Sequence, residues 1–412
     1  MGQRAAAALA VAIALALVAS VPEDAVAQAP ARPPTPSSPG AGEAQGLSRF
    51  IEGLWPDAQA AGISRATFNA AFNGLQPDPK VAALTRSQGE FSRPISAYVT
   101  GAVSSARISQ GQALAERWRA VLDRVETRYG VPRAIVLAIW ASESGYGAAS
   151  GSFDTIRSLA TLAYMGARQD LFRRELVAAL RILEEDHLSR GEIKGSWAGA
   201  MGQPQFMPSS FLAHAVDGDG DGRRDIWGSV PDVLASIGHF FAQSGWRPGL
   251  PWGFEARLPA GLDLSAHERE MAEWARMGVV RADGRTLPRA GTGRIFLPAG
   301  IEGPAFILTE NWEAIRAYNT SDAYALAIGL LSDRIAGGPA LSRPWPTGAV
   351  LSADERREVH RRLATRGLYT GTPDGKFGAQ TRDAVRRYQI SRGLLPDGYA
   401  DREVLEALRG PD

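Results

Sequence analysis

One segment, residues 134–147, constrains the fold of this chain more than any other. Every residue from 134 to 141 is apolar, and Pro132 stands where its fixed φ suits the first turn of a helix. Apolar residues on all sides predict a helix that is buried rather than amphipathic. Gly145 and Gly147 follow closely and predict the end of that helix.

Glu143 lies at the end of this predicted helix and is the only carboxylate between Glu126 and Asp154. Loss of solvation disfavours a charged carboxylate, so we expect a raised pKa and a side chain able to donate a proton near neutral pH. The same residue could instead cap a turn or pair with an arginine, because ion pairs also perturb pKa values. The segment alone leaves both interpretations open.

The composition is that of a globular protein with room for two or three domains. The chain has 412 residues, of which 45% are hydrophobic and 22% charged. Its formal net charge is +1. Duplex DNA requires a basic footprint, so this balance argues against a nucleic-acid partner.

The N-terminus has the pattern of a secretory signal peptide over residues 1–27. Arg4 precedes an apolar run from Ala5 to Val21, and residues 25–27, Ala-Val-Ala, offer a small-residue cleavage site. A retained membrane anchor is the alternative, although the run is short for a span. The chain contains no cysteine, which excludes an N-terminal lipid on cysteine and any disulfide. We therefore expect an exported protein that is soluble after cleavage.

Composition divides the rest of the chain into four parts. Residues 28–46 are rich in Pro and Ala and predict a disordered linker, whereas residues 47–337 show mainly helical periodicity. Within the latter, residues 247–301 are rich in Gly and Pro and could include a few short strands. A second linker, 338–350, precedes a helical tail, 351–409, with a small predicted core of Leu363, Leu368, Val385, Tyr388, Leu394, Leu405 and Leu408. The predicted fold class is α+β, mostly helical.

Residues 194–210 combine small residues with amides, aromatic rings and hydroxyl groups. Gly195, Gly199 and Gly202 allow close backbone approach, while Gln203 and Gln205 offer neutral hydrogen bonds. Neutral hydrogen-bonding groups beside aromatic faces suit a sugar better than a phosphate. The alternative is a tight turn that packs against the core.

Aspartate alternates with glycine in the loop that begins at residue 217, as at the start of an EF-hand calcium loop. The predicted metal ligands are Asp217, Asp219, Asp221, the carbonyl group of Arg223, and Asp225. The twelfth position is Gly228 rather than the usual glutamate, so we expect weak affinity and a structural role. A solvated acidic turn is the alternative.

Residues 311–326 contain three aromatic residues and two asparagines beside a helical pattern, which is also typical of an aromatic core stripe with a helix cap. The five histidines show no metal-ligand spacing, and the serines near them lack the pattern of a catalytic nucleophile.

Together these motifs resemble the membrane-bound type B family of lytic murein transglycosylases, from about residue 47 to 335. The resemblance is carried by Glu143 to Gly147, by Gly199 to Ser210, by the aspartate loop, and by Tyr318-Asn319 with Tyr324. It implies a lysozyme-like domain that cleaves the β-1,4 bond between N-acetylmuramic acid and N-acetylglucosamine in peptidoglycan. The implied product is a 1,6-anhydromuramic end, and the implied location is the periplasm.

The resemblance also implies roles for individual residues. Glu143 matches the family's catalytic acid/base, and no cofactor is implied for catalysis. The positions that match its substrate cleft are Arg168, Ser196, Gln205, Tyr318, Asn319 and Tyr324. Arg168 matches one of a pair of cleft arginines, but its neighbour here is Ala167. The aspartate loop matches the family's structural calcium site.

The tail resembles the small three-helix peptidoglycan-binding domain over residues 351–408. The matching positions include Gly367, Tyr369 and Gly371, the run from Asp374 to Gly378, and Asp397-Gly398. The expected partners are glycan strands and other proteins of cell-wall synthesis or hydrolysis, with the protein itself a monomer.

Two other functions stay open at this point. A hydrolytic muramidase on the same scaffold would need a second acid or a positioned water, because most glycosidases use two carboxylates. Asp154 and Asp170 are the candidates near Glu143 in the sequence. A non-catalytic scaffold that binds the cell wall would need no acid at all.

Overall fold

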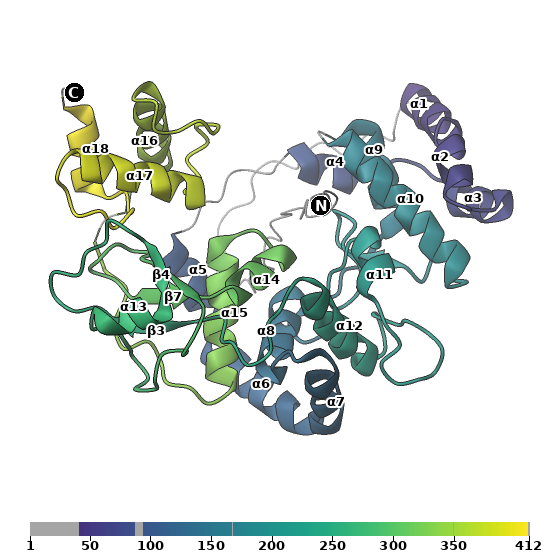
Figure 1. Cartoon of the computed structure of the whole chain (residues 1–412). Coiled ribbons are helices and arrows are strands. Elements are labelled where there is room, and N and C mark those ends of the chain that lie inside the picture. The colour runs from purple at the N-terminus through teal and green to yellow at the C-terminus, as the bar shows by residue number, and fades with distance from the viewer. Residues whose placement is uncertain (1–40, 87–93, 167, 349, 411–412) are drawn as a thin grey trace, which may run out of the picture. The chain divides into compact units, whose positions relative to one another are not determined.

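The computed structural model describes residues 41–86, 94–166, 168–348 and 350–410. The predicted signal peptide and residues 28–40 of the predicted linker lie outside them. Helix α1 (Ala41–Glu52) begins before residue 47, so residues 41–46 are helical rather than part of a linker. The described chain is mostly helical, with a two-stranded and a five-stranded sheet (Figure 1), in agreement with the predicted α+β class.

The described residues form two compact units. Unit 1 contains residues 94–142 and 238–410, and unit 2 contains residues 41–86 and 143–237. The chain passes from unit 1 to unit 2 within helix α8 (Arg133–Ser144), immediately before Glu143, and returns within α12 (Val230–Gln243).

Helix α8 is the buried helix that the sequence predicts. All residues from 134 to 141 are buried, and Val136, Leu137 and Ile139 have no exposed surface. Burial on every side agrees with apolar residues at every position. The helix ends at Ser144, where Gly145 takes a positive φ of 57°.

Unit 2 is built around a long amphipathic helix, α10 (Gln169–Glu185), which lies side by side with α9 (Thr155–Met165) in Figure 1. Leu176, Leu180 and Leu183 face its core, at the spacing of one helical face. The remaining helices of unit 2 are α2 (Trp55–Ala60), α3 (Arg65–Phe72), α4 (Pro79–Arg86) and α11 (Pro208–His214). Strands β1 (Phe153–Asp154) and β2 (Lys194–Gly195) pair antiparallel.

Unit 1 combines helices with the larger sheet, whose strand order is β4-β6-β7-β3-β5 and whose pairings are all antiparallel. The sheet and α13 (Met271–Arg276) enclose a core around Trp274. The strands are β3 (Gly253–Arg257), β4 (Glu268–Glu270), β5 (Val280–Arg281), β6 (Thr292–Phe296) and β7 (Ala305–Leu308). Short strands within 247–301 are thus confirmed, and β7 lies just beyond that range.

Five further helices complete the central part of unit 1. They are α5 (Ile95–Ala102), α6 (Ser105–Arg117), α7 (Arg119–Tyr129), α14 (Asn311–Tyr318) and α15 (Asp322–Ile335). Helix α15 is apolar on most of its surface and packs against α5, α6 and α14. This packing fixes the short segment between α14 and α15, which carries Asn319, one of the predicted cleft residues, directly after Tyr318 at the end of α14.

The tail forms three helices, α16 (Ala353–Thr365), α17 (Ala379–Ser391) and α18 (Arg402–Arg409), as predicted. Five of the predicted core residues, Leu363, Val385, Tyr388, Leu405 and Leu408, are buried in one cluster. Leu368 packs at its margin, whereas Leu394 lies outside it. The core also contains residues that were not predicted for it: Leu351, Val359, Tyr369, Ala384, Ala400 and Val404.

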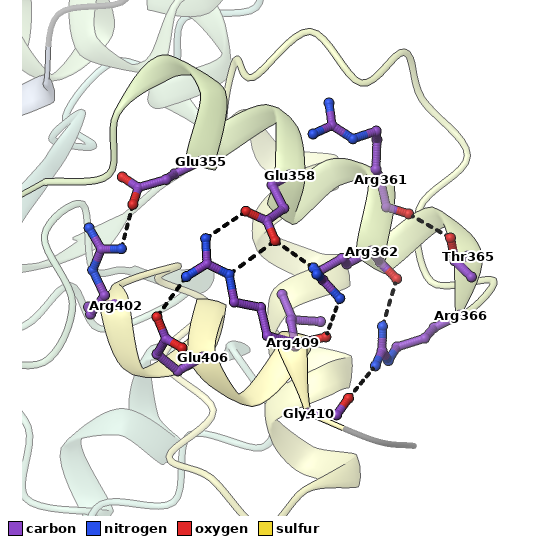
Figure 2. Close-up of polar contacts among 11 residues, drawn as sticks. Glu355, Glu358, Arg361, Arg362, Thr365, Arg366, Arg402, Glu406, Arg409 and Gly410 are labelled. Atoms are coloured by element: carbon purple, nitrogen blue, oxygen red, sulfur yellow. Dashed lines mark hydrogen bonds and ion pairs between the residues drawn. The ribbon is translucent and has the colours of Figure 1, made fainter.

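Ion pairs join α18 to α16 on the surface of the tail (Figure 2). Glu358 accepts hydrogen bonds from Arg409 and from Arg362, at 2.7 Å each, and Glu355 pairs with Arg402. The hydrogen bonds from Arg409 and Arg362 lower the pKa of Glu358 to about 2. Exposed pairs contribute only about 0–1 kcal/mol each, so the shared carboxylate mainly fixes the register of the two helices.

Candidate active site

Glu143 occupies the last turn of α8 and is half-buried. The three residues Gly145, Tyr146 and Gly147 all have positive φ, at 57°, 60° and 88°. Ser144 is buried, and its hydroxyl oxygen accepts a hydrogen bond of 3.0 Å from the amide of Gly147. A buried tyrosine in the left-handed region costs free energy, and such strain is concentrated at functional sites.

The turn after Glu143 packs against the glycine-rich segment predicted to bind sugar. A Cβ atom added to Gly147 would lie 2.5 Å from Oε1 of Gln203, and one added to Gly151 would lie 2.2 Å from the carbonyl oxygen of Gly195. The backbone of Gly195 leaves no room for a side chain at Gly151, and the positive φ of both glycines, 88° and 90°, also disfavours one. The structure therefore brings together the two segments that carry Glu143, Ser196 and Gln205.

Gln205 is held in place by its own side-chain amide. Its φ is 52°, and it is 8% exposed. Its Nε2 atom donates hydrogen bonds to the carbonyl oxygens of Ser150, at 2.9 Å, and Gly202, at 2.7 Å. Both donors of this amide are thereby used, so Oε1 is the atom left to contact a ligand.

Ser196 begins the turn that leads to this segment and is half-buried. Its hydroxyl oxygen accepts a hydrogen bond of 3.2 Å from the amide of Ala200, and its backbone amide donates to the carbonyl oxygen of the same residue at 2.7 Å. The hydrogen bond from Ala200 thus positions the Ser196 side chain. The hydrogen atom of its hydroxyl group is still able to form a hydrogen bond to a ligand.

Asp154 has a structural role in this region. One of its oxygens caps α9 by accepting the amide of Arg157 at 2.9 Å, and the other pairs with Arg190 at 2.6 Å. Asp170, the second acid considered for hydrolysis, is exposed in the first turn of α10. Arg168 is exposed at the start of the same helix.

Three of the predicted cleft residues belong to unit 1. The ring of Tyr318 at the end of α14 is 4.6 Å from that of Phe240 and 5.9 Å from that of Phe241, between ring centroids. Oδ1 of Asn319 accepts the amide of Ser321 at 3.0 Å, which leaves its Nδ2 group to donate. Tyr324 in α15 is only 4% exposed, so most of its ring belongs to the core.

The aspartate loop brings three of its acids together. Carboxylate oxygens of Asp217, Asp219 and Asp221 lie within 4.8 Å of one another. Oxygen-only donors at this spacing fit a hard cation such as calcium. Hydrogen bonds from the amides of Gly222 and Gly220 lower the pKa of Asp217, which keeps this ligand ionised.

Asp225 does not join this group. Its Oδ1 atom accepts the amides of Trp227, at 2.9 Å, and Gly228, at 2.8 Å, and so closes the end of the loop. A Cβ atom at Gly228 would lie 2.7 Å from Oδ2 of Asp225. Backbone contacts therefore take the place of the usual acid at the twelfth position. The backbone amide of Arg223 donates a hydrogen bond of 2.8 Å to Oδ1 of Asp221.

Two buried acids near these segments were missed by the sequence analysis. Asp232, without exposed surface, accepts the amides of Gly218 at 2.8 Å and Asp225 at 2.7 Å, and thus joins the two ends of the aspartate loop. Glu175 in α10 holds Ser209. Burial raises the pKa of both carboxyl groups. Neither residue belongs to a motif, and only the tertiary structure reveals that these acids are buried.

This architecture agrees with a known enzyme family. Residues 46–333 match the family model described as "Transglycosylase SLT domain", and residues 352–408 match "Putative peptidoglycan binding domain". The first match covers more than half of the chain, and the chain therefore belongs to the transglycosylase family. The resemblance inferred from the motifs is confirmed.

Solved and curated relatives agree with this membership. SltB3 from Pseudomonas aeruginosa, solved in complex with NAG-anhNAM-pentapeptide and with NAG-NAM-pentapeptide, is 45% identical, with a TM-score of 0.82 over 88% of this chain and 99% of that chain. Membrane-bound lytic murein transglycosylase B of Escherichia coli is 29% identical over 249 residues, which span 56% of this chain and 64% of that protein. The Escherichia coli lytic transglycosylase Slt35, solved in complex with calcium, is 26% identical, with a TM-score of 0.59 over 71% of this chain and 92% of that chain.

Proposed function

We propose that this protein is a lytic transglycosylase that cleaves the β-1,4 bond between N-acetylmuramic acid and N-acetylglucosamine in peptidoglycan. Glu143 is the single acid/base. The observation that carries the proposal is the position of Glu143, half-buried at the end of α8 in a strained turn that packs against the Gln205 segment. The family and the peptidoglycan fragments bound to SltB3 support the choice of substrate.

The reaction uses one carboxyl group twice. Glu143 donates its proton to the glycosidic oxygen as the bond from that oxygen to C1 of the muramic residue breaks. The N-acetyl oxygen of the same sugar stabilises the positive charge that develops at C1. The Glu143 carboxylate then removes the proton of the 6-hydroxyl group while O6 bonds to C1. The proton is returned to Glu143, and no water is consumed.

The other predicted cleft residues orient the glycan in this proposal. Gln205 accepts through Oε1, and Ser196 donates through its hydroxyl group. Asn319 donates through Nδ2, and the aromatic ring of Tyr318 packs against a sugar face. Tyr324 shapes the protein around Tyr318 and Asn319 in unit 1, because little of its ring is exposed. Arg168 contributes positive charge at the surface of unit 2.

The surroundings of the other acids favour an anhydro product over hydrolysis. Hydrolysis would need a second carboxylate to act as a base or nucleophile. Both oxygens of Asp154 are engaged, by the amide of Arg157 and by Arg190. Asp170 is exposed in the first turn of a helix. Neither acid offers a carboxylate free to act in a sheltered site.

Replacing Glu143 by glutamine tests the assignment of the acid. General acid–base catalysis contributes roughly 10² to 10⁴ in rate, so we expect turnover of purified peptidoglycan to fall at least about 100-fold. The unfolding temperature should stay close to that of the wild type, because glutamine keeps the shape of the side chain. Undiminished release of soluble fragments by the Glu143→Gln variant would refute the assignment.

Mass spectrometry of the digestion products separates transglycosylation from hydrolysis. We expect fragments ending in 1,6-anhydromuramic acid, which are lighter than reducing ends by one water. Reducing ends would indicate a hydrolytic muramidase. Binding to sacculi without any soluble fragment would indicate a scaffold.

We further propose that the tail binds peptidoglycan and delivers the catalytic region to it, on the basis of the family match over residues 352–408. The glycan strand is the partner we assign, and proteins of cell-wall synthesis or hydrolysis are the partners we expect beyond it. The protein should act as a monomer. Sedimentation with purified sacculi by the full chain, but not by a chain that ends at residue 337, would support this role of the tail.

Calcium is the ion we propose for the aspartate loop, as a structural ligand rather than a catalytic one. Asp217, Asp219 and Asp221 would hold it through carboxylate oxygens, and a calcium complex of Slt35 supports the choice of ion. The bound ion would neutralise the clustered negative charge of the loop.

We propose that the protein acts in the periplasm after removal of residues 1–27, because its substrate lies outside the cytoplasm. Among the described residues, no helix has the length and the apolar character needed to cross a bilayer. A mature protein whose first residue is Gln28 would support this proposal, and N-terminal sequencing of the exported protein is the measurement. Retention of residues 1–27 would contradict it.

A further inference from the structure

Glu175 is a buried acid that the proposed chemistry does not use. It lies in α10 and is 6% exposed. Its Oε2 atom accepts the backbone amide of Ser209 at 2.9 Å, and its Oε1 atom accepts the hydroxyl group of Ser209 at 2.7 Å. A buried carboxylate is costly unless its oxygens are hydrogen-bonded, so both hydrogen bonds to Ser209 are needed to keep it there.

Ser209 stands at the start of α11, a helix whose own sequence supplies no cap. The N-cap position is Met207, which offers no side-chain acceptor, and Pro208 follows it. The first amides of a helix need acceptors from elsewhere. Glu175 provides one of them from a helix more than 30 residues away in the sequence.

The same short segment holds Gln205. Met201 and Phe206 exchange two backbone hydrogen bonds, of 2.7 and 3.1 Å, which close the turn that contains Gln205. The hydrogen bonds from Ser209 to Glu175 hold the chain where it leaves this turn, three residues beyond Phe206. Gln205 itself has a φ of 52°, a conformation that persists only where the surrounding contacts determine it.

We propose that Glu175 is a positioning residue: its hydrogen bonds to Ser209 anchor the segment that keeps Gln205 in its left-handed conformation, with Oε1 presented to the glycan. This inference rests on the proposed function, because it assigns Gln205 a contact with the substrate. Glu175 itself does not touch the substrate.

The test is the kinetics of Glu175→Gln with soluble glycan strands as substrate. Glutamine accepts the backbone amide of Ser209 through Oε1, but its Nε2 group can only donate, so the charge-assisted hydrogen bond from the Ser209 hydroxyl group gives way to a weaker neutral one without loss of volume. We expect KM to rise about tenfold, a change on the scale of one hydrogen bond to a charged group, and kcat to stay within about twofold. In a Gln205→Ala background, Glu175→Gln should change KM by less than about twofold, because residues that act through one another are not additive.

Glu184→Gln is the matched control. Glu184 lies in the same helix and accepts the amide and the hydroxyl group of Ser64 at 3.1 and 2.9 Å, but this serine caps α3 instead. The Glu184→Gln variant should leave KM unchanged. Ser209→Ala removes only the hydroxyl donor and should raise KM less than Glu175→Gln, and this second variant keeps the test decisive if Glu175→Gln folds poorly.

Two results would overturn the inference: an unchanged KM in both Glu175→Gln and Ser209→Ala, or equal effects of Glu175→Gln with and without Gln205. Its failure can be told from failure of the proposed function. An inactive Glu143→Gln variant beside a Glu175→Gln variant with normal KM would reject the positioning role alone, whereas an active Glu143→Gln variant would reject the assigned chemistry.

Discussion

At the scale of single residues, close backbone contact determines which amino acids the site accepts. Gly151 has a φ of 90°, and its position against the carbonyl group of Gly195 leaves no room for a Cβ atom. The atoms that would collide with this Cβ atom belong to the backbone of Gly195 and Ser196, which cannot rotate away as a side chain can. Gly151 therefore packs directly against the backbone of the glycine-rich segment at Gly195.

Gly151→Ala should destabilise the protein strongly. The left-handed conformation alone costs about 1 kcal/mol for alanine, and displacement of the Gly195 backbone adds to it, so we expect the free energy of unfolding to fall by more than about 2 kcal/mol. Chemical denaturation followed by circular dichroism measures this change.

Gly62→Ala is the matched control for this substitution. Gly62 has a φ of 82° but nothing within 4 Å of an added Cβ atom, so only the conformational cost of about 1 kcal/mol applies. Equal losses in the two variants would show that the contact with Gly195 contributes nothing.

The sequence was sufficient to find Glu143 but not to define what its neighbours do. A lone acid after an apolar helix stands out in one dimension. The sequence identified Gln205 only as a neutral amide. In the structure, its Nε2 group donates to the carbonyl oxygens of Gly202 and of Ser150, which is far away in the sequence. Hydrogen-bond partners of this kind are set by the tertiary fold.

At the scale of elements, the aspartate loop shows how an incomplete motif can still form an ordered structure. Asp232 and Asp225 accept the backbone amides that join the ends of the loop. Asp217, Asp219 and Asp221 accept amides within the loop itself. These hydrogen bonds already hold the loop, so binding of the proposed calcium ion should cost little conformational entropy.

Calcium should raise the thermal stability of the protein. A ligand that binds only the folded state stabilises it by about 1.4 kcal/mol at ten times its dissociation constant. The measurement is the unfolding temperature of protein treated with a chelator, with and without added calcium. Asp221→Asn should lose most of this response, and an equal shift with magnesium would argue against the oxygen-rich site that calcium prefers.

Elements with strong local signals were predicted well. Helix α8 was evident because its apolar run leaves no polar face, and the tail helices because their turn residues and leucines follow a recognisable spacing. Helix α11 has only seven residues and no local cap. Glu175, from a distant part of the sequence, accepts the amide of Ser209 in its first turn, and the sequence of α11 alone does not reveal this contact.

At the scale of the whole molecule, the tail contains a buried histidine that makes its stability depend on pH. His360 has no exposed surface, accepts the amide of Gly375 through Nδ1 at 3.1 Å, and lies 3.0 Å from the hydroxyl oxygen of Thr381 through Nε2. Its ring stacks on Tyr369 with centroids 4.4 Å apart. Burial lowers the pKa of His360, although Asp374 opposes this shift.

Lowering the pH should therefore loosen the tail. The unfolded state takes up a proton on His360 near pH 6.5, whereas the folded state does so only at lower pH. The contribution of the neutral His360 ring to the stability of the tail is complete above about pH 6.5. It decreases as the pH falls towards the lowered pKa, by at most about 1.4 kcal/mol per pH unit. Hydrogen exchange of α16 and α17 amides, corrected for intrinsic rates, measures this between pH 7 and pH 5.

A His360→Gln variant should remove this pH dependence, because glutamine does not titrate. Exchange in α9 and α10 serves as the internal reference. If tail protection in the wild type is the same at both pH values, the buried ring does not control the stability of the tail.

The sequence by itself determined the helical fold class, the three-helix tail, the acid at the end of α8 and the metal-like spacing of the aspartates, because each depends on residues close together along the chain. Only the tertiary structure decided which acids are buried or engaged. Asp154 became a cap and ion-pair partner, Asp232 a tie across the loop, and Glu175 an anchor for Ser209. The physical reason is that desolvation and hydrogen bonding of a carboxylate depend on groups that the fold brings together from distant positions.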